Sequence, residues 1–92
     1  MKKINIIPLA QKKSGKRGIP QNWIEETVYS PGQIVSGYGG RKVAQRRYIV
    51  EGKEYLLRVI YEEREDMYEV VTAYLTSQIE RYWKGGEDEN RI

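Results

Sequence analysis

The chain contains neither cysteine nor histidine, and each absence excludes a class of chemistry. Without cysteine there is no disulfide and no thiolate metal site, which fits a cytoplasmic location. Without histidine the chain lacks the usual zinc ligand and the side chain that most often acts as a general base near neutral pH. We therefore expect no metal site and no cofactor, and any catalysis must depend on other residue types.

Long apolar segments are also missing. No run approaches the roughly 20 residues that a membrane span needs, and residues 4–10 are too short and too broken for a signal peptide. The 92 residues include 39% hydrophobic and 32% charged residues, with a mean hydropathy of −0.74, which is ordinary for a soluble globular protein. We expect no membrane partner, a single domain over residues 1–84 and a disordered tail at 85–92.

Positive charge is concentrated in the first two thirds of the chain. Residues 1–60 contain twelve Lys or Arg against four Glu, a net charge of +8, whereas residues 61–92 contain four against nine acids, a net charge of −5. A basic portion of this kind indicates a polyanionic partner such as nucleic acid. A solvated surface that binds no ligand is the alternative.

The residue pattern predicts a helix followed by strands. Pro20 suits a first helical turn, and an apolar stripe at helical spacing follows it, until Ser30-Pro31-Gly32 ends the helix: Trp23, Ile24, Thr27 and Val28. Runs rich in β-branched and aromatic residues then predict strands, with a hairpin turn at Glu51-Gly52. These strands are expected at 33–38, 41–50, 53–62 and 67–75.

The two ends of this pattern leave alternatives open. Residues 2–7 predict either a short strand or an extended arm, and residues 11–17 either a short helix or a loop, because Gly15 weakens a helix. Ser77 and Glu80 fit a capping box, which predicts a short C-terminal helix packed on the sheet. The expected α+β fold therefore has one or two N-terminal helices on one face of a four-stranded antiparallel sheet.

Alternation along the strands divides the predicted sheet into two faces. The face expected to contact the helices carries apolar residues: Leu57, Val59, Val71 and Ala73. The opposite face carries Arg58, Thr72 and Tyr74, and it gains either Gln45 and Arg47 or Arg46 and Tyr48, because a slip of one residue exchanges these two pairs. Arginine, tyrosine and hydroxyl groups on one face can hold a phosphodiester and stack a base.

Short segments in a fixed order resemble a group of small bacterial domains of unknown function that are classed with RelE-like toxins. The matching segments lie within residues 8–83: Arg17-Gly18-Ile19, Ser30-Pro31, Gln33-Ile34-Val35, Gly40-Arg41-Lys42, 55–61 and 70–77. The resemblance implies a barnase–EndoU–colicin–RelE type fold. It also implies endoribonuclease activity as the toxin of a toxin–antitoxin pair, with RNA, including ribosome-bound mRNA, and a cognate antitoxin as partners.

One position departs from the family pattern. Members of this group often carry a His-Ala pair near their start, and the matching positions here are Leu9-Ala10. The resemblance therefore implies either an inactive member or a nuclease that cleaves without histidine. In RelE-like toxins, Lys, Arg and Tyr can share the catalytic roles.

Metal-independent RNA cleavage needs a base for the 2′-hydroxyl, stabilisation of the charged phosphorane and an acid for the leaving oxygen. We expect Arg58, with Arg47, to bind the phosphate, and Tyr74 to stack or transfer a proton. Lys42 is the candidate base, provided that its pKa is lowered. The remaining residues predicted to contact RNA are Arg17, Arg41, Arg46, Tyr48 and Thr72.

Two other functions fit the same sequence. The first is a non-catalytic RNA- or protein-binding module that keeps the same fold without the histidine. The second is a structural domain that forms a homodimer through a sheet edge. At the level of single residues, the alternative is that Arg58 is solvated or salt-bridged and that Tyr74 packs.

Overall fold

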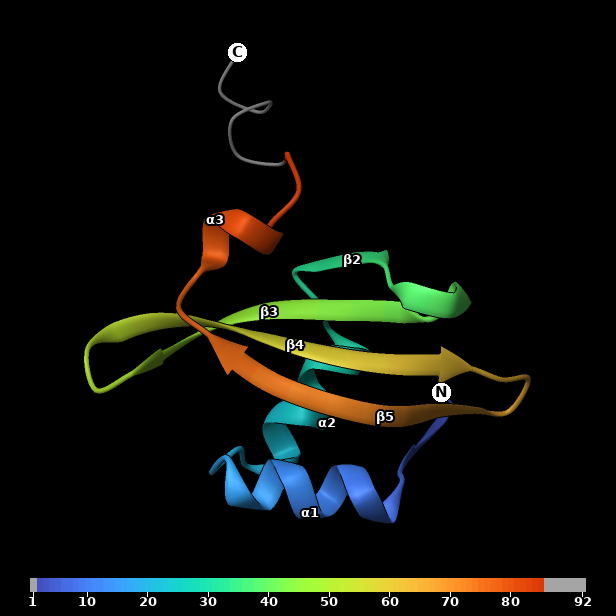
Figure 1. Cartoon of the computed structure of the whole chain (residues 1–92). Coiled ribbons are helices and arrows are strands. Elements are labelled where there is room, and N and C mark those ends of the chain that lie inside the picture. Colours follow the sequence, from blue (N-terminus) through green and yellow to red (C-terminus); the bar gives the residue numbers. More distant parts are fainter. Residues whose placement is uncertain (1, 86–92) are drawn as a thin grey trace.

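Five strands form one sheet in the order β1-β5-β4-β3-β2, with helices on both of its faces (Figure 1). The computed structural model describes residues 2–85. Along the chain the elements are β1 (Lys3–Ile6), α1 (Pro8–Lys16), α2 (Gln21–Tyr29), β2 (Gln33–Ser36), the 3-10 turn η1 (Tyr38–Gly40), β3 (Lys42–Val50), β4 (Lys53–Glu63), β5 (Met67–Thr76) and α3 (Ile79–Tyr82). The predicted α+β class is confirmed.

The sheet is mixed, which corrects the expected four-stranded antiparallel arrangement. Strands β2 to β5 form an antiparallel meander, but β1 pairs in parallel with β5, with Ile4 opposite Tyr68 and Ile6 opposite Val70. The two N-terminal helices connect β1 to the meander, and a connection of this length allows a parallel neighbour. The short alternating segment at the start of the chain is therefore a strand.

Helix α1 forms in spite of Gly15. Pro8 occupies its first turn, and Ala10 and Ser14, one turn apart, are buried where the helix packs against β5. The helix ends in a Schellman motif: the N–H of Gly18 bonds to Gly15, and that of Ile19 bonds to Ser14. Gly18 has a φ of +71°, which suits glycine. Packing and a good terminus thus outweigh the low helix propensity of one glycine.

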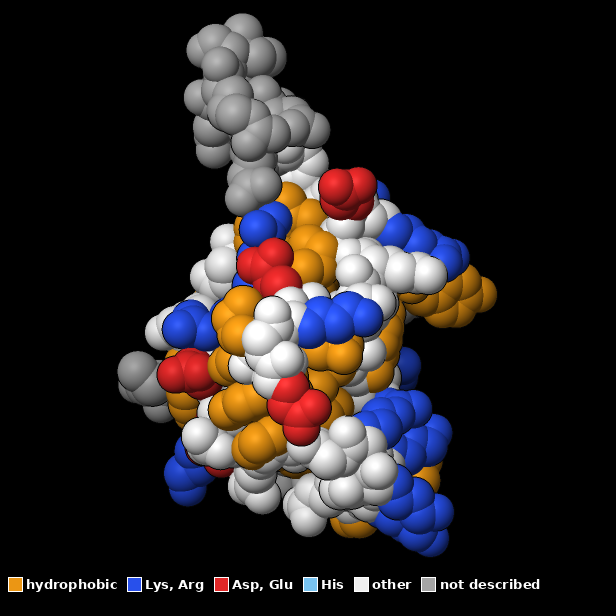
Figure 2. Space-filling model, turned by 90° about the vertical axis from the view of Figure 1, so that its left-hand side faces the viewer, with side chains coloured by type: hydrophobic (Ala, Val, Ile, Leu, Met, Phe, Trp, Pro, Cys, Tyr) orange, Lys and Arg blue, Asp and Glu red, His pale blue; other side chains and the backbone are white. Residues whose placement is uncertain are grey.

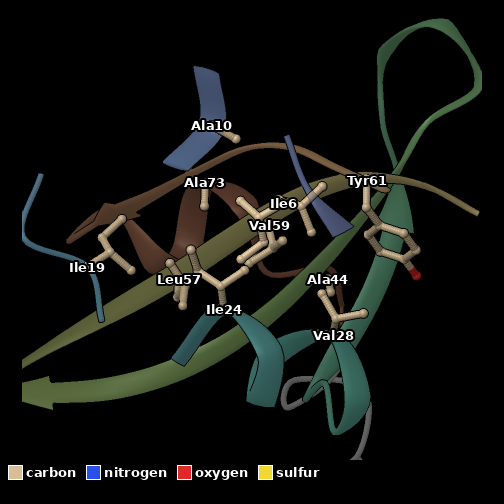
Figure 3. Packing of buried hydrophobic residues seen from close by; sticks show 11 residues of the cluster. Ile6, Ala10, Ile19, Ile24, Val28, Ala44, Leu57, Val59, Tyr61 and Ala73 are labelled. Carbon is tan, nitrogen blue, oxygen red and sulfur yellow. The ribbon is translucent and has the colours of Figure 1, made fainter. Parts of the chain in front are cut away.

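Helices α1 and α2 cover one face of the sheet and enclose the core (Figures 1 and 3). The core combines residues of these helices and their flanks with sheet residues: Ile6, Ala10, Ile19, Ile24, Val28, Ala44, Leu57, Val59, Tyr61, Val70 and Ala73. Each fully buried Val, Leu or Ile contributes about 1.5–3 kcal/mol. The predicted helix stripe is confirmed for Ile24, Thr27 and Val28, which are buried.

The predicted inward face of the sheet is largely confirmed. Leu57, Val59 and Ala73 lie in the core, but Val71 does not, and Val70 takes a core position instead. The reason is a register shift between β4 and β5, where Ile60 lies opposite Thr72 and Tyr61 opposite Val70. An irregularity of this kind changes which side chains of a strand point inward.

The short helix α3 lies on the opposite face of the sheet (Figure 1). The predicted capping box is wrong: the helix has no side-chain cap, and the hydroxyl of Thr76 accepts the N–H of Gln78 at 3.0 Å. Of the predicted tail, only Gly85 lies within the described residues. None of the described helices has the length and apolar character needed to cross a membrane.

Candidate nucleic-acid interface

A row of four polar side chains crosses the face of the sheet that α1 and α2 leave open. Its members face one another on neighbouring strands: Gln33 on β2, Gln45 on β3, Arg58 on β4 and Tyr74 on β5. We call these four residues the polar row. The register places Gln45 and Arg47 on the face of Arg58, which selects one of the two pairs that the sequence left open.

Hydrogen bonds connect the polar row from end to end. Gln45 Nε2 donates to Gln33 Oε1 at 2.9 Å, Arg58 Nε donates to Gln45 Oε1 at 2.7 Å, and Arg58 Nη1 donates to the Tyr74 hydroxyl. Gln45 is fully buried. Because its Oε1 accepts from Arg58 and its Nε2 donates to Gln33, the orientation of its amide is fixed. The network therefore holds the guanidinium in one place by contacts with neutral groups.

Arg58 has no carboxylate partner among residues 2–85, although it is half-buried. Four other arginines, two on β3 and two in loops, do have one: Arg46 with Glu26 at 3.7 Å, Arg47 with Glu54 at 3.8 Å, Arg41 with Glu62 at 3.0 Å and Arg64 with Glu69 at 2.9 Å. A cation that is partly desolvated and lacks a counter-ion attracts an anion. Arg58 is therefore the strongest candidate for binding a phosphate.

Residues 79–84, which we call the C-terminal cover, lie over the polar row. The Tyr82 ring centroid is 4.1 Å from the Arg58 guanidinium, and the Trp83 ring centroid is 4.6 Å from that of Arg47. Gln33 fixes the end of the cover, because its amide accepts the N–H of Lys84 at 3.0 Å and donates to the Lys84 carbonyl at 2.9 Å. Access to Arg58 therefore depends on the position of Tyr82.

Lys42 lies away from the polar row and does not meet the condition for a general base. Its Nζ is 2.6 Å from Glu63, whose carboxylate also contacts Lys2 at 2.7 Å. The hydrogen bond and charge of Glu63 raise the pKa of Lys42. A base at neutral pH needs the opposite shift, so this ion pair counts against Lys42 as the base.

Arg46 and Tyr48 lie on the helix side of the sheet. Tyr48 stacks on Trp23, with ring centroids 4.3 Å apart and an interplanar angle of 13°, and its hydroxyl donates to Glu26 at 2.6 Å. Burial, and then Glu26, raise the pKa of Tyr48. Arg46 donates to the Ser30 carbonyl at 2.5 Å. Both residues contact α2 or its C-terminal end, so the alternative that placed them beside Arg58 is wrong, whereas their contact with RNA stays a prediction.

The remaining predicted RNA contacts separate into two locations. Thr72 shares the open face with Tyr74, and Arg17 reaches the edge of β5, where Nη1 donates to the Ala73 carbonyl at 2.7 Å and lies 3.5 Å from the Thr72 hydroxyl. Arg47 also faces the open side, at the C-terminal cover. Arg41 is instead paired with Glu62, four residues beyond Arg58 along β4.

The sequence reasoning missed Gln33 and Tyr82 as parts of this site, and it gave Gln45 only as one of two alternatives for this face. A glutamine that is buried in the middle of a sheet needs hydrogen-bond partners, and that requirement identifies Gln45 once its burial is known. A shallow groove of about 820 Å³ lies beside the site, lined by Arg47, Glu54, Ser77, Gln78, Ile79, Glu80 and Arg81. Within residues 2–85, no group of three acidic, histidine or cysteine side chains is placed to hold a metal ion.

No protein-family model, no curated protein and no solved structure matches this chain.

Proposed function

We propose that this protein is a RelE-like toxin domain that binds RNA on the open face of its sheet and cleaves it as an endoribonuclease. The observation that carries the proposal is the half-buried Arg58, which the polar row holds in place with neutral partners and without a carboxylate. A phosphodiester supplies the missing negative charge, and the planar guanidinium can donate parallel hydrogen bonds to two of its oxygens.

The chemistry assigned to the row is transesterification at phosphorus. The 2′-oxygen attacks the neighbouring phosphate, the bond from phosphorus to the 5′-oxygen breaks, and the products are a 2′,3′-cyclic phosphate and a 5′-hydroxyl. Arg58 stabilises the charge that develops on the phosphorane oxygens. Tyr74 accepts a hydrogen bond from Arg58 and donates to no other group within residues 2–85, so its own proton is available for the leaving 5′-oxygen.

The mechanism includes no side chain that accepts the proton of the 2′-hydroxyl. The chain has no histidine, and Lys42 is held as a cation by Glu63. The proton of the 2′-hydroxyl then passes to solvent. A positioned base typically contributes 10²–10⁴-fold to the rate, so we expect slow cleavage that becomes faster with rising pH.

The test is the variant Arg58→Gln with a mixed RNA substrate, measured for binding and for cleavage with and without ribosomes. We expect RNA binding to weaken by at least tenfold and cleavage to fall below detection. Arg64→Gln is the matched control, because it removes the same charge from a loop arginine that is paired with Glu69. Thermal unfolding of both variants checks that the fold is intact, and unchanged cleavage by Arg58→Gln would exclude the proposal.

A toxin has a second measurable property. Expression of the chain in bacteria should slow growth, and Arg58→Gln should relieve this effect at equal protein level. An unaltered growth rate during expression of the original chain contradicts the toxin assignment, even where RNA binding is found.

The second candidate is a non-catalytic RNA-binding module of the same fold. The observation that favours it is that Lys42, the predicted base, lies away from the polar row and is engaged by Glu63. RNA binding that depends on Arg58, without any cleavage at raised pH, would support this module over the nuclease.

A further inference from the structure

Helix α1 presents an exposed stripe of positive charge. Lys12, Lys13 and Lys16 are all exposed and follow one another at helical spacing, whereas Ala10 and Ser14 turn inward. At 1.5 Å per residue, Lys12 and Lys16 are about 6 Å apart along the helix axis. In Figure 2, Lys and Arg side chains gather at the lower right, at the height where Figure 1 places α1.

These three lysines have no counter-ion among the described residues. Every ion pair of the described chain involves a basic residue outside α1: Lys2, Arg41, Lys42, Arg46, Arg47 and Arg64. In the sequence, no acidic residue precedes Glu25. A helix surface that serves only for solubility usually mixes both signs of charge, so α1 concentrates positive potential instead.

The helix dipole explains only a part of this arrangement. Lys13 and Lys16 lie in the last turn, where a positive charge stabilises a helix by about 0.3–1 kcal/mol each. This stabilisation of the helix C-terminus requires only one or two positive charges. It does not explain Lys12, which lies outside the last turn, or the lack of acidic residues before Glu25.

Arg17 connects the stripe with the open face of the sheet. It follows α1 directly, and its guanidinium contacts both the Ala73 carbonyl at the β5 edge and the hydroxyl of Thr72. Thr72 lies two residues before Tyr74 on the same strand and face. A chain of phosphates can therefore run from α1, across the edge of β5, to Arg58.

We propose that Lys12, Lys13 and Lys16 bind the RNA backbone outside the polar row and hold the strand in register for Arg58. The inference rests on the proposed function, because it extends the same RNA site. An anionic membrane is the less favoured partner: the buried side of α1 packs on β5, and Leu9 is its one exposed large apolar residue. A membrane-surface helix needs an apolar face that is free to insert.

The test measures binding of a single-stranded RNA of roughly 20 nucleotides, longer than most single-strand site sizes, at several salt concentrations. Each phosphate contact on a single strand contributes about −0.7 to the slope of log K against log salt. The triple variant K12Q/K13Q/K16Q should therefore make the slope less steep by about 2 and weaken binding at low salt. K12R/K13R/K16R should bind as the original chain does, because it keeps the charge.

A second control, K3Q/K53Q/R64Q, removes three exposed charges outside α1 and outside the C-terminal cover, and should reduce the slope less. A slope that is equal in the original chain and in K12Q/K13Q/K16Q, with binding still dependent on Arg58, overturns this inference and leaves the proposed function intact. If the original chain does not bind RNA, both the proposed function and this inference are wrong. Loss of binding to phosphatidylserine vesicles in the lysine variant, without any RNA binding, would assign the stripe to a membrane instead.

Discussion

Gln45 supports the charge of Arg58 from a fully buried position. Its amide accepts from Arg58 and donates to Gln33 and to the Tyr82 carbonyl, so three groups lose a partner if it is replaced. A buried donor left without an acceptor costs about 1–3 kcal/mol. The polar row is thus a stabilising network as well as a candidate binding site.

We predict that Gln45→Leu lowers the free energy of unfolding by about 1–3 kcal/mol and also weakens RNA binding. Urea denaturation measures the first effect and an RNA titration the second. Gln33→Leu is the control at the end of the row, where Arg58 keeps its partner. Equal stability of Gln45→Leu and the original chain would mean that the buried network contributes nothing.

Glu63 is the residue whose protonation has the clearest consequence for stability. Hydrogen bonds from Lys2 and Lys42 lower its pKa from 4.5 to about 2. A carboxylate with a lowered folded-state pKa stabilises the fold above its unfolded pKa, and this contribution is lost as the pH falls through the folded pKa. The loss should therefore occur between pH 4.5 and about 2.

We predict that Glu63→Gln is less stable than the original chain at neutral pH and that the difference disappears as the pH approaches 2. Chemical denaturation at a series of pH values measures it. Glu65→Gln, in the loop after β4 and without an ion pair in the described chain, should show no such pH-dependent difference. A constant difference at all pH values would contradict the assigned ion pairs.

Helix α1 contains a glycine, Gly15, whose replacement is expected to stabilise the protein. An added Cβ at Gly15 would have no atom within 4 Å, and its φ lies outside the left-handed region. Replacing such a glycine by alanine removes conformational freedom from the unfolded chain. Gly18, by contrast, has a φ of +71° and ends the helix.

We predict that Gly15→Ala stabilises the protein by about 0.4–1 kcal/mol and that Gly18→Ala destabilises it by about 1 kcal/mol. Thermal unfolding of both variants gives the two signs in one experiment. If both variants were destabilised, Gly15 would have a role that its open surroundings do not show.

The strands of the meander and α2 could be predicted because their signals are local. Apolar spacing in 21–29 and β-branched runs in the strands are properties of neighbouring residues, and the turn at Glu51-Gly52 follows from short-range preference. The parallel pairing of β1 could not be predicted. A four-residue strand carries too little pattern to identify its neighbour, which is 64 residues away at Lys3 and Met67.

The part of the candidate site that could be predicted is the set of residues that share a face of the sheet, because strand alternation determines it. Arg58, Thr72 and Tyr74 share a face as expected, because each strand alternates its side chains. The sequence did not decide which face of the sheet Arg46 and Tyr48 occupy, because a register slip of one residue moves every side chain of a strand to the opposite face. The ion pair that counts against Lys42 as the base joins β3 to the end of β4 and to Lys2, and no local pattern shows such a contact.

At the scale of the whole molecule, the two faces of the sheet are covered to different degrees. Helices α1 and α2 cover the core on one face, whereas on the other face the C-terminal cover lies over the region of the polar row (Figure 1). Because Tyr82 stacks on Arg58, RNA and Tyr82 compete for the same guanidinium.

We predict that Tyr82→Ala raises RNA affinity a fewfold, since cation–π contacts of this kind contribute about 0.5–2 kcal/mol. RNA titration measures it, with Tyr38→Ala as the control because Tyr38 is 98% exposed. A lower affinity for Tyr82→Ala would mean that this ring stacks on a base rather than competing with the RNA.

The parallel pairing of β1 and β5 also has a consequence for biosynthesis. A ribosome makes β1 before any other strand and β5 after all the others, yet the two are neighbours in the finished sheet. During translation, Ile4 and Ile6 have no strand to pair with until residues 67–70 have left the exit tunnel. The emerging chain can form its helices and the β3–β4 hairpin, but the sheet is completed only after β5 is released.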